Sequence, residues 1–529
     1  MNNFLCFSGC ALLLLLSLVG CNSSDKALPY QTLRLNMVSE PPTLDPRINT
    51  DLVSLNIIKH LFEGLVRETK NGIEPAIAES FTLSEDGKTY HFKLREAYWS
   101  NGRPVTAHDF ISAWQWVIAP QNPSGMARLQ YVIENAQEIK KGVKPLTDFG
   151  AYALNDRELI IKLAKPAPHF LSLLTLPIYF PVYRQADDEA INWAFEAATF
   201  ISNGPFNLKT WRHSDQIVLV KNPHYWNNEA VQLEQIHFNM IEDAGTELQM
   251  YESGALDWCG NPLTIGIPKD ALPTLQSSGK LHSDHWNAPI FYMFNTLKHP
   301  FNNSNLRKAF TYAINRKDVV EHILQGKGQE ALSLVPTGLI AEASYFKDHD
   351  LPAARKHFQT ALEELKITKE QLPPITLIYN SAELHQSVAQ AVQEQIRKAF
   401  GISLQLQHME WKAYLSEVDK RDFCIARLGM QPPYDDPLAF IEIFSDRTNF
   451  LNVASWENPE YIALYEQSFF QKDKERLETL QKAEAILMDE MPFCPLFFYK
   501  LTYLRNEKLQ NVFISPTGMV DFTWAYFDE

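Results

Sequence analysis

Cysteine is scarce in this chain, and its thiols are too far apart to form a recognisable framework. Of six cysteines in 529 residues, three fall within the first 21 positions and the others are Cys259, Cys424 and Cys494. Such spacing fits neither a disulfide-stapled scaffold nor a zinc site. We therefore expect no metal site here and predict that these three thiols are buried and unreactive.

Long apolar runs and clustered basic residues are also missing. A membrane-spanning helix needs about 20 apolar residues, and no run approaching that length follows the first 20 positions. With 48 Lys and Arg against 63 Asp and Glu, the net charge is −15. Nucleic acids are bound through clustered cations, so the sequence predicts no nucleic-acid partner.

The common catalytic motifs are absent too. The chain has no Gly-x-Ser-x-Gly elbow, no His-Glu-x-x-His helix and no Cys-x-x-Cys pair. Gly87-Lys88-Thr89 lacks the upstream glycine of a phosphate loop and reads as a turn. We expect no catalytic residue and no cofactor, although distant segments could still assemble an enzyme site.

The first 21 residues predict export and lipid attachment. Residues 11–19 are apolar except for Ser17, which is long enough for a signal-peptide core but too short for a membrane span. The segment Leu18-Val19-Gly20-Cys21 resembles the lipobox of bacterial lipoproteins. We predict a signal peptide over residues 1–20, a lipid on Cys21 and a polar tether over residues 21–29, placing the protein in the periplasm or cell envelope on a membrane.

One feature of this leader departs from the lipoprotein pattern. Residues 1–10 contain no Lys or Arg, whereas signal peptides begin with a basic stretch. The alternative is an ordinary cleaved signal in which Cys21 is incidental.

The remaining chain predicts a large α/β protein. It exceeds the size at which a single hydrophobic core stops growing, so two or three lobes are expected. Alternating apolar residues predict strands, and helical spacing after a Thr106 cap predicts helices. The strands are expected over 32–37, 89–94, 158–163 and 216–221, and the helices over 107–117, 305–313 and 382–400. Their interleaving favours an α/β fold.

Several short segments, in order, resemble the oligopeptide-binding proteins of ABC importers, the extracytoplasmic solute-binding family 5. Each is weak alone, but together they extend over most of residues 32–529. They include Glu-Pro-Pro-Thr-Leu-Asp-Pro at 40–46, His-Leu-Phe-Glu-Gly-Leu at 60–65, the stretch 94–110, Ser-Asn-Gly-Pro-Phe at 202–206, Lys-Asn-Pro-His-Tyr-Trp at 221–226, the segments 307–310 and 313–316, and Glu-Trp-Lys at 410–412.

The resemblance implies a periplasmic-binding-protein type II-like fold, with two large lobes around a ligand cleft and a smaller third lobe. Lobe I would comprise residues 30–62, 185–290 and 492–529. Lobe II would be the insert 63–184, and lobe III residues 291–491. Hinge closure around the ligand would report that the site is occupied.

The family also implies a function. Such a protein captures oligopeptides between its lobes, as a monomer, and delivers them unchanged to ABC permease subunits in the inner or cytoplasmic membrane. An alternative ligand is a modified peptide such as a muropeptide. Relatives in the family also bind nickel or haem, but this sequence has no clustered histidine motif that would favour either ligand. A secreted enzyme or an adhesin on the same fold is the alternative from another class.

Candidate ligand-binding residues follow from positions that match the family's motifs. The matching positions are Thr50, Asp51, Leu52, Tyr131, Asn203, His385, Trp411, Arg427, Gly429, Met430, Tyr434 and Asp435. The 50–52 loop would pair with the ligand main chain, and Trp411 would line a pocket. Arg427 would either meet a carboxylate or form a structural ion pair, and His385 would either lie near the ligand's carboxyl end or be structural.

The expected partner for the ligand's ammonium group is missing. Pro433 stands where peptide-binding members have an aspartate. Asp435 or Asp436 could replace it, or both could be solvated turn residues, and Asp51 could supply the charge instead. This departure motivates the muropeptide alternative.

Overall fold

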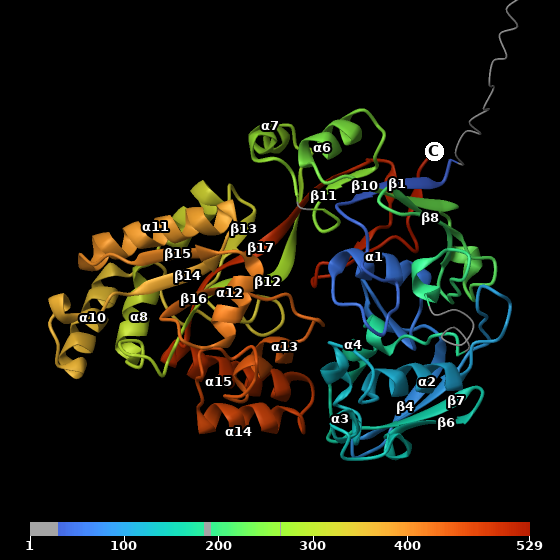
Figure 1. Cartoon of the computed structure of the whole chain (residues 1–529), viewed down its shortest axis with the longest axis horizontal. Helices are drawn as coiled ribbons and strands as arrows, with labels where there is room; N and C mark the ends of the chain where they lie inside the picture. The colour runs from blue at the N-terminus through green and yellow to red at the C-terminus, as the bar shows by residue number, and fades with distance from the viewer. Residues whose placement is uncertain (1–29, 185–191, 265) are drawn as a thin grey trace, which may run out of the picture.

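The computed structural model describes residues 30–184, 192–264 and 266–529 (Figure 1). The predicted signal peptide, tether and lipid site at Cys21 lie outside these residues. Within the described ranges, no helix combines the length and apolar character needed to cross a bilayer.

The elements predicted from residue patterns are confirmed. Strands β1 (Thr32–Met37), β5 (Thr89–Leu94) and β9 (Gln216–Lys221) have the predicted bounds, and β7 (Glu158–Lys162) ends one residue early. Helices α8 (Ser304–Ala313) and α11 (Glu383–Phe400) differ from the prediction by one residue at the start. The Thr106–Asp109 capping box opens α2 (Ala107–Ile118), as its sequence predicts.

A four-stranded sheet brings the first strand together with the middle of the chain. Its order is β1-β10-β9-β8, with β10 at Gln235–Met240 and β8 at Phe206–Arg212. Strand β1 runs parallel to β10, pairing Thr32 with Gln235, and the other contacts are antiparallel. Helix α1 (Leu52–Leu61) contacts β8.

A second, antiparallel sheet has the order β4-β5-β7-β6, with β4 at Ala78–Leu83 and β6 at Ala151–Asn155. Helix α2 contacts this sheet at β6. The hairpin of β2 (Val66–Thr69) and β3 (Gly72–Pro75) connects α1 to it. Helices α3 (Ala136–Lys140) and α4 (Phe170–Leu174) follow.

The third sheet has seven strands in the order β11-β17-β12-β16-β14-β15, with β13 on β17. The strands are β11 (Trp258–Gly260), β12 (His282–Phe294), β13 (Gly328–Glu330), β14 (Thr376–Asn380), β15 (Gln405–Met409), β16 (Ile425–Gly429) and β17 (Phe493–Arg505). The long strands β12 and β17 are antiparallel and lie between the two halves of the molecule in Figure 1.

Helices surround the third sheet (Figure 1). They are α6 (Ala244–Glu252), α7 (Leu272–Ser277), α9 (Arg316–Asp318), α10 (Leu351–Leu365), α12 (Trp411–Asp419), α13 (Leu438–Ile441), α14 (Pro459–Ser468) and α15 (Asp473–Glu490), besides α8 and α11. After β17 the chain returns to the first half through β18 (Leu509–Gln510), β19 (Phe513–Ile514), β20 (Val520–Asp521) and β21 (Tyr526–Phe527). Gln31 and Phe527 are hydrogen-bonded, so the end of the chain lies beside its first strand.

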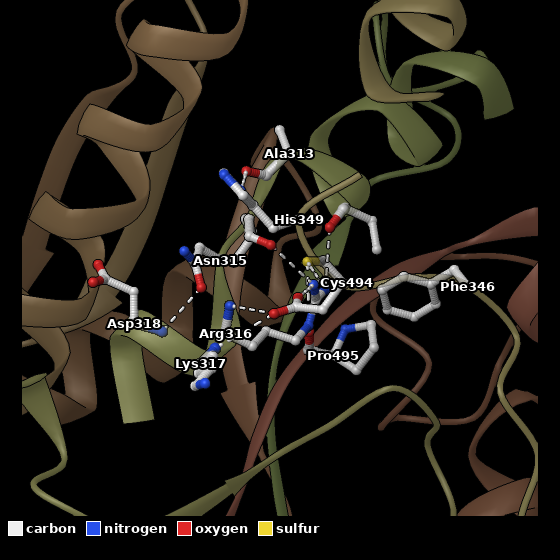
Figure 2. Close-up of polar contacts among 12 residues, drawn as sticks. Ala313, Asn315, Arg316, Lys317, Asp318, Phe346, His349, Cys494 and Pro495 are labelled. Carbon is white, nitrogen blue, oxygen red and sulfur yellow. Dashed lines mark hydrogen bonds and ion pairs between the residues drawn. The ribbon is translucent and has the colours of Figure 1, made fainter. Parts of the chain in front are cut away.

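A buried arginine on α9 joins the third sheet to the segment that precedes α10 (Figure 2). The guanidinium of Arg316, which has no exposed surface, donates to Asp348 at 2.8 Å and to the Pro495 carbonyl at 2.7 Å. It also lies 4.7 Å from the Phe346 ring centroid. Since a buried charge needs a counter-ion, Asp348 holds this part of the fold together.

We predict that Asp348→Asn lowers the free energy of unfolding by about 3 kcal/mol, because it leaves the Arg316 cation buried without a countercharge. Urea denaturation measures the change. The neighbouring exposed Lys317→Gln is the control and should change stability by about 0.5 kcal/mol or less. Equal stability of the two variants would contradict the role given to Asp348.

Candidate ligand-binding site

A cavity of about 1330 Å³ lies where the third sheet meets the α1 and β2–β3 region. One side is formed by residues 46–73 with parts of 126–129 and 172–178. The rest of the lining comes from the segments 282–285, 431–435 and 503–505, and from the C-terminal return 512–519, which is hydrogen-bonded to the β2 hairpin. Figure 1 shows α1 in the right half and β16 and α13 in the left half, so the cavity is lined from both halves.

The predicted loop Thr50-Asp51-Leu52 lines this cavity at the start of α1. The Asp51 side chain accepts hydrogen bonds from the Ser54 backbone N–H and the Ser54 hydroxyl, both at 2.8 Å. This is an N-cap arrangement, which satisfies free N–H groups of the first helical turn. Both Asp51 oxygens are therefore engaged within the helix.

Glu68 of β2 extends the same side of the cavity. It accepts a hydrogen bond from the Ser515 hydroxyl at 2.7 Å. Its neighbour Arg67 lies between Glu63 and Asp521, at 2.9 Å from each. The hairpin that carries Glu68 is thereby fixed to the C-terminal segment.

The loop after β16 forms the facing side. Gln431 donates to the Thr517 carbonyl at 2.6 Å, and Pro432 and Pro433 line the cavity beside it. Tyr434 is buried and its ring stacks on His169, with centroids 5.3 Å apart. These contacts fix the loop from two other parts of the chain.

Asp435 is the acidic residue that this loop presents to the cavity. It accepts one hydrogen bond, from Asn287 at 2.8 Å. Burial, the nearby Glu68 carboxylate and Asp436 raise the pKa of Asp435 to about 6, and the Asn287 bond opposes them. Asp436 instead holds Arg476 through two bonds of 2.6 and 2.9 Å.

Basic groups line other parts of the cavity. They are Lys59, Lys70, His282, His285 and Arg505. Among the described residues, Lys59, Lys70 and Arg505 form no ion pair with a carboxylate. The cavity can therefore accept anionic groups as well as cationic ones.

Another group of predicted residues lies together but outside the cavity lining. Burial and the Arg427 charge lower the pKa of His385 to about 3, so the imidazole is neutral. Arg427 donates to Asn380 at 3.5 Å, its Nε has no hydrogen-bond partner, and no carboxylate in the described ranges pairs with it. The alternative of a structural ion pair for Arg427 is thus not supported, and a carboxylate remains the partner its charge would favour.

Trp411 and Tyr414 adjoin Arg427. Trp411 begins α12, is 50% exposed, and its ring lies 6.1 Å from that of Tyr414, whose hydroxyl donates to the Arg427 carbonyl. Such an exposed ring does not line the cavity in this structure.

The remaining candidates occupy different environments. Asn203 is buried, and its side-chain amide bonds both backbone groups of Glu63, which is a structural role. Tyr131 follows the short helix 127–130 and is absent from the lining. Gly429 ends β16, where a Cβ would lie 2.4 Å from Ile290 Cδ1, so a larger residue would require the Ile290 side chain to move. Met430 donates its N–H to the Pro289 carbonyl.

The three downstream thiols are free, with Cys259 and Cys494 buried and Cys424 half-buried. The prediction of burial is therefore confirmed for two of them. In the described part of the chain, no three His, Cys, Asp or Glu side chains are grouped closely enough to hold a metal ion.

Together, the three larger sheets and the cavity lined from both halves of the molecule define a bilobal protein with a cavity that could hold a ligand. The profile of the family "Bacterial extracellular solute-binding proteins, family 5 Middle" matches residues 72–452, and the chain belongs to this family. The predicted fold class, with two large lobes around a cleft and a smaller third lobe, is confirmed.

Named relatives span nearly the whole chain. The oligopeptide-binding protein OppA of Bacillus subtilis is 38% identical, over 94% of this chain and 92% of that protein. The unliganded, open form of the murein tripeptide-binding protein MppA superposes with a TM-score of 0.80 at 28% identity, covering 94% and 97% of the two chains. Peptide-bound OppA of Listeria monocytogenes superposes with a TM-score of 0.76 at 27% identity, covering 94% of this chain and 99% of that chain.

One cavity residue, Glu68, and two residues that bond to the cavity lining, Asn287 and Ser515, escaped prediction from the sequence. Glu68, in a polar hairpin, has the pattern of an exposed turn. Asn287 and Ser515 carry no distinguishing motif and reach the site only through β12 and the C-terminal return. The only available signal was the proline at 433, which indicated that a carboxylate had to come from elsewhere.

We predict that Asp435→Asn stabilises the ligand-free protein at pH 7.5. The raised pKa means that the ionised carboxylate is less favourable in the folded state, a cost of up to about 3 kcal/mol well above pH 6. Well below the unfolded-state pKa of 3.8 the group is protonated in both states, and the difference should vanish. Thermal unfolding at pH 7.5 and at about pH 2.5 tests this, with the exposed Glu74→Gln as control; a pH-independent difference would contradict it.

Proposed function

We propose that this chain is an extracytoplasmic solute-binding protein that binds peptides in its cavity and delivers them, chemically unchanged, to an ABC importer. The size and lining of the cavity are the main observations that support this proposal. Its volume of about 1330 Å³ exceeds the roughly 300–1,000 Å³ of small-molecule pockets, and its lining mixes both charges with apolar side chains. Membership of a solute-binding family and the names of the relatives support it.

An extended peptide suits this arrangement. Thr50, Asp51 and Leu52 and the 431–435 loop line the cavity, and we propose that backbone groups of these segments pair with a ligand main chain, which would give affinity without strong sequence preference. Tyr434 and Asp435 complete that loop. We keep Arg427 and His385 as the site for a ligand carboxylate, with Trp411, Gly429 and Met430 beside them. The buried, fully bonded Asn203 and the off-lining Tyr131 have weaker support.

A modified peptide such as a muropeptide is the second candidate. Pro433 occupies the expected anchor position, and Lys59, Lys70 and Arg505 lack carboxylate partners among the described residues. These cations suit a ligand with more than one carboxylate. The likeness to MppA points in the same direction.

The cellular setting belongs to the same proposal. We propose a monomer attached to a membrane by a lipid on Cys21, in the periplasm or cell envelope, where it meets permease subunits. Family membership supports an extracytoplasmic location. The lobe boundaries 30–62, 63–184, 185–290, 291–491 and 492–529 remain predictions, as does the absence of catalysis.

Native mass spectrometry should detect peptide on the purified protein. After the ligand is stripped by unfolding and refolding, incubation with a tripeptide pool should restore a bound mass, and the released peptides should be intact. Preference for a γ-linked muropeptide over the pool would favour the second candidate. Hydrolysed products would overturn the transport proposal.

Replacing Cys21 by serine should release the protein from membranes. The unmodified protein should sediment with membranes and incorporate labelled palmitate, whereas Cys21→Ser should do neither, because two or more acyl chains are needed for stable attachment. An unlabelled, unattached wild-type protein would instead support the ordinary cleaved signal.

A further inference from the structure

We propose that Lys59 and Arg505 form a subsite for a ligand carboxylate at the end of the cavity where β12 begins and β17 ends. The inference rests on the proposed function, because it specifies which peptides the same cavity prefers. The subsite is separate from Arg427 and His385, which lie outside the cavity lining. Its ligands are peptides that place an acidic side chain or their terminal carboxylate at this end.

Lys59 faces the cavity from helix α1. It lines the cavity with Leu52 and Leu55, at the spacing of three and four residues that places side chains on one face of a helix. The neighbouring face is fixed to the C-terminal segment, because the His60 ring accepts from the Phe522 N–H at 2.9 Å. Helix α1 therefore holds a half-buried ammonium at the cavity wall.

Arg505 reaches the cavity from the last residue of β17. Side chains two residues apart on a strand share a face, so Arg505 and Tyr503 line the cavity while Leu504 is buried in a small core. Tyr503 pairs with His282 of β12, and their ring centroids are 5.2 Å apart. Burial and the Arg505 charge lower the pKa of His282, and Asp284 opposes them. The guanidinium and the imidazole therefore belong to one cluster.

A continuous series of aromatic rings connects the surroundings of Lys59 with those of Arg505. The centroid distances are 5.7 Å between His60 and Phe522, 5.9 Å between Phe522 and Trp258, and 4.2 Å between Trp258 and Tyr503. Trp258 is also the strand partner of Arg505. Because Lys59 adjoins the first ring in sequence, both cations belong to the same end of the cavity.

Both cations are available to a ligand. Within the described ranges, neither the Lys59 ammonium nor the Arg505 guanidinium takes part in an ion pair or a hydrogen bond. The nearby Asp284 carboxylate accepts instead from the Tyr503 hydroxyl, at 2.6 Å. Both cations are half-buried and have lost part of their hydration without a compensating contact, which a carboxylate would supply.

The acidic residues without a countercharge lie farther along the cavity. Asp435 bonds to Asn287 of β12, and Glu68 is close enough to raise the pKa of Asp435. At about 3.3 Å per residue, and with a bulge on the way, β12 covers roughly 15 Å from His282 to Asn287. The lining therefore differs in charge between its two ends, and the end near Arg505 is the one that suits an anionic group.

Three pools of pentapeptides made from Ala, Ser and Leu test the subsite and separate the two sources of a carboxylate. The first pool carries one Glu at varied positions and a C-terminal amide. The second carries Gln instead and a free carboxyl terminus, and the third carries Gln and the amide. Ligand-stripped, full-length protein is incubated with each pool, and retention is read by native mass spectrometry.

We expect a carboxylate-bearing pool to be retained at least tenfold better than the third pool. Preference for the first pool identifies an acidic side chain as the ligand group, and preference for the second identifies the carboxyl terminus. Equal retention of all three overturns this inference but leaves peptide binding intact, whereas retention of none overturns the proposed function as well.

Titration calorimetry on variants then assigns the preference to the two residues. The ratio of the affinities for the best-retained peptide and its uncharged counterpart should fall at least fivefold in Lys59→Gln and in Arg505→Gln, and to about one in the double variant. Lys508→Gln, on the same C-terminal segment but outside the cavity lining, is the matched control and should keep the ratio. Thermal unfolding confirms that each variant is folded. A tenfold ratio in the double variant would place the carboxylate at another cation and overturn the proposal.

The imidazole of His282 provides an independent readout of where the carboxylate binds. Nuclear magnetic resonance of labelled histidine side chains, with the signal assigned through His282→Asn, follows its titration in the wild-type complexes. A carboxylate at this end adds a negative charge that favours the imidazolium, so the pKa of His282 should be higher with the acidic peptide than with its uncharged counterpart. The same pKa in both complexes would overturn the proposed position of the subsite.

Discussion

The ion pairs of Arg67 with Glu63 and Asp521 connect parts of the molecule that are far apart in sequence. The Arg67 side chain is only 13% exposed, and its guanidinium stands 2.9 Å from each carboxylate. Burial would raise the pKa of Asp521, but Arg67 and His60 lower it to about 2, so the pair is fully charged. Because a buried ion is costly without its partner, the β2 hairpin and the C-terminal segment cannot separate independently. Glu68, which lines the cavity, and Ser515, which donates to it, adjoin these elements and owe their positions to this constraint.

Some carboxylates at the cavity are paired or hydrogen-bonded within the protein, whereas others have no countercharge. Asp436 and Arg476 satisfy each other, as do Asp51 and the first turn of α1. Asp435 and Glu68 are held by neutral partners alone. An uncompensated carboxylate lowers the stability of the empty protein, yet it increases the difference in free energy between empty and occupied states. Ligand can drive closure only through such a difference.

Local patterns predicted the elements of the fold well because strands and helices depend on side chains close in sequence. The Thr106 capping box and the alternation of Thr32–Met37 are examples. The site was harder to predict because it depends on long-range pairing. Asp435 could be predicted as a site residue from its position after β16. That Asp435 rather than Asp436 lacks an ion pair depends on the contact between Arg476 and Asp436, which no local pattern reveals. Glu68 becomes a site residue only through Ser515 and Asp521, near the other end of the chain.

Binding through the ligand backbone leaves its side chains weakly specified, so discrimination must come from groups that every acceptable ligand shares. A charged terminus is such a group. Among the described residues of the cavity lining, Glu68, Asp435, Lys59 and Lys70 form no ion pair, so a ligand that carries charges of both signs would compensate more of the lining than a neutral ligand.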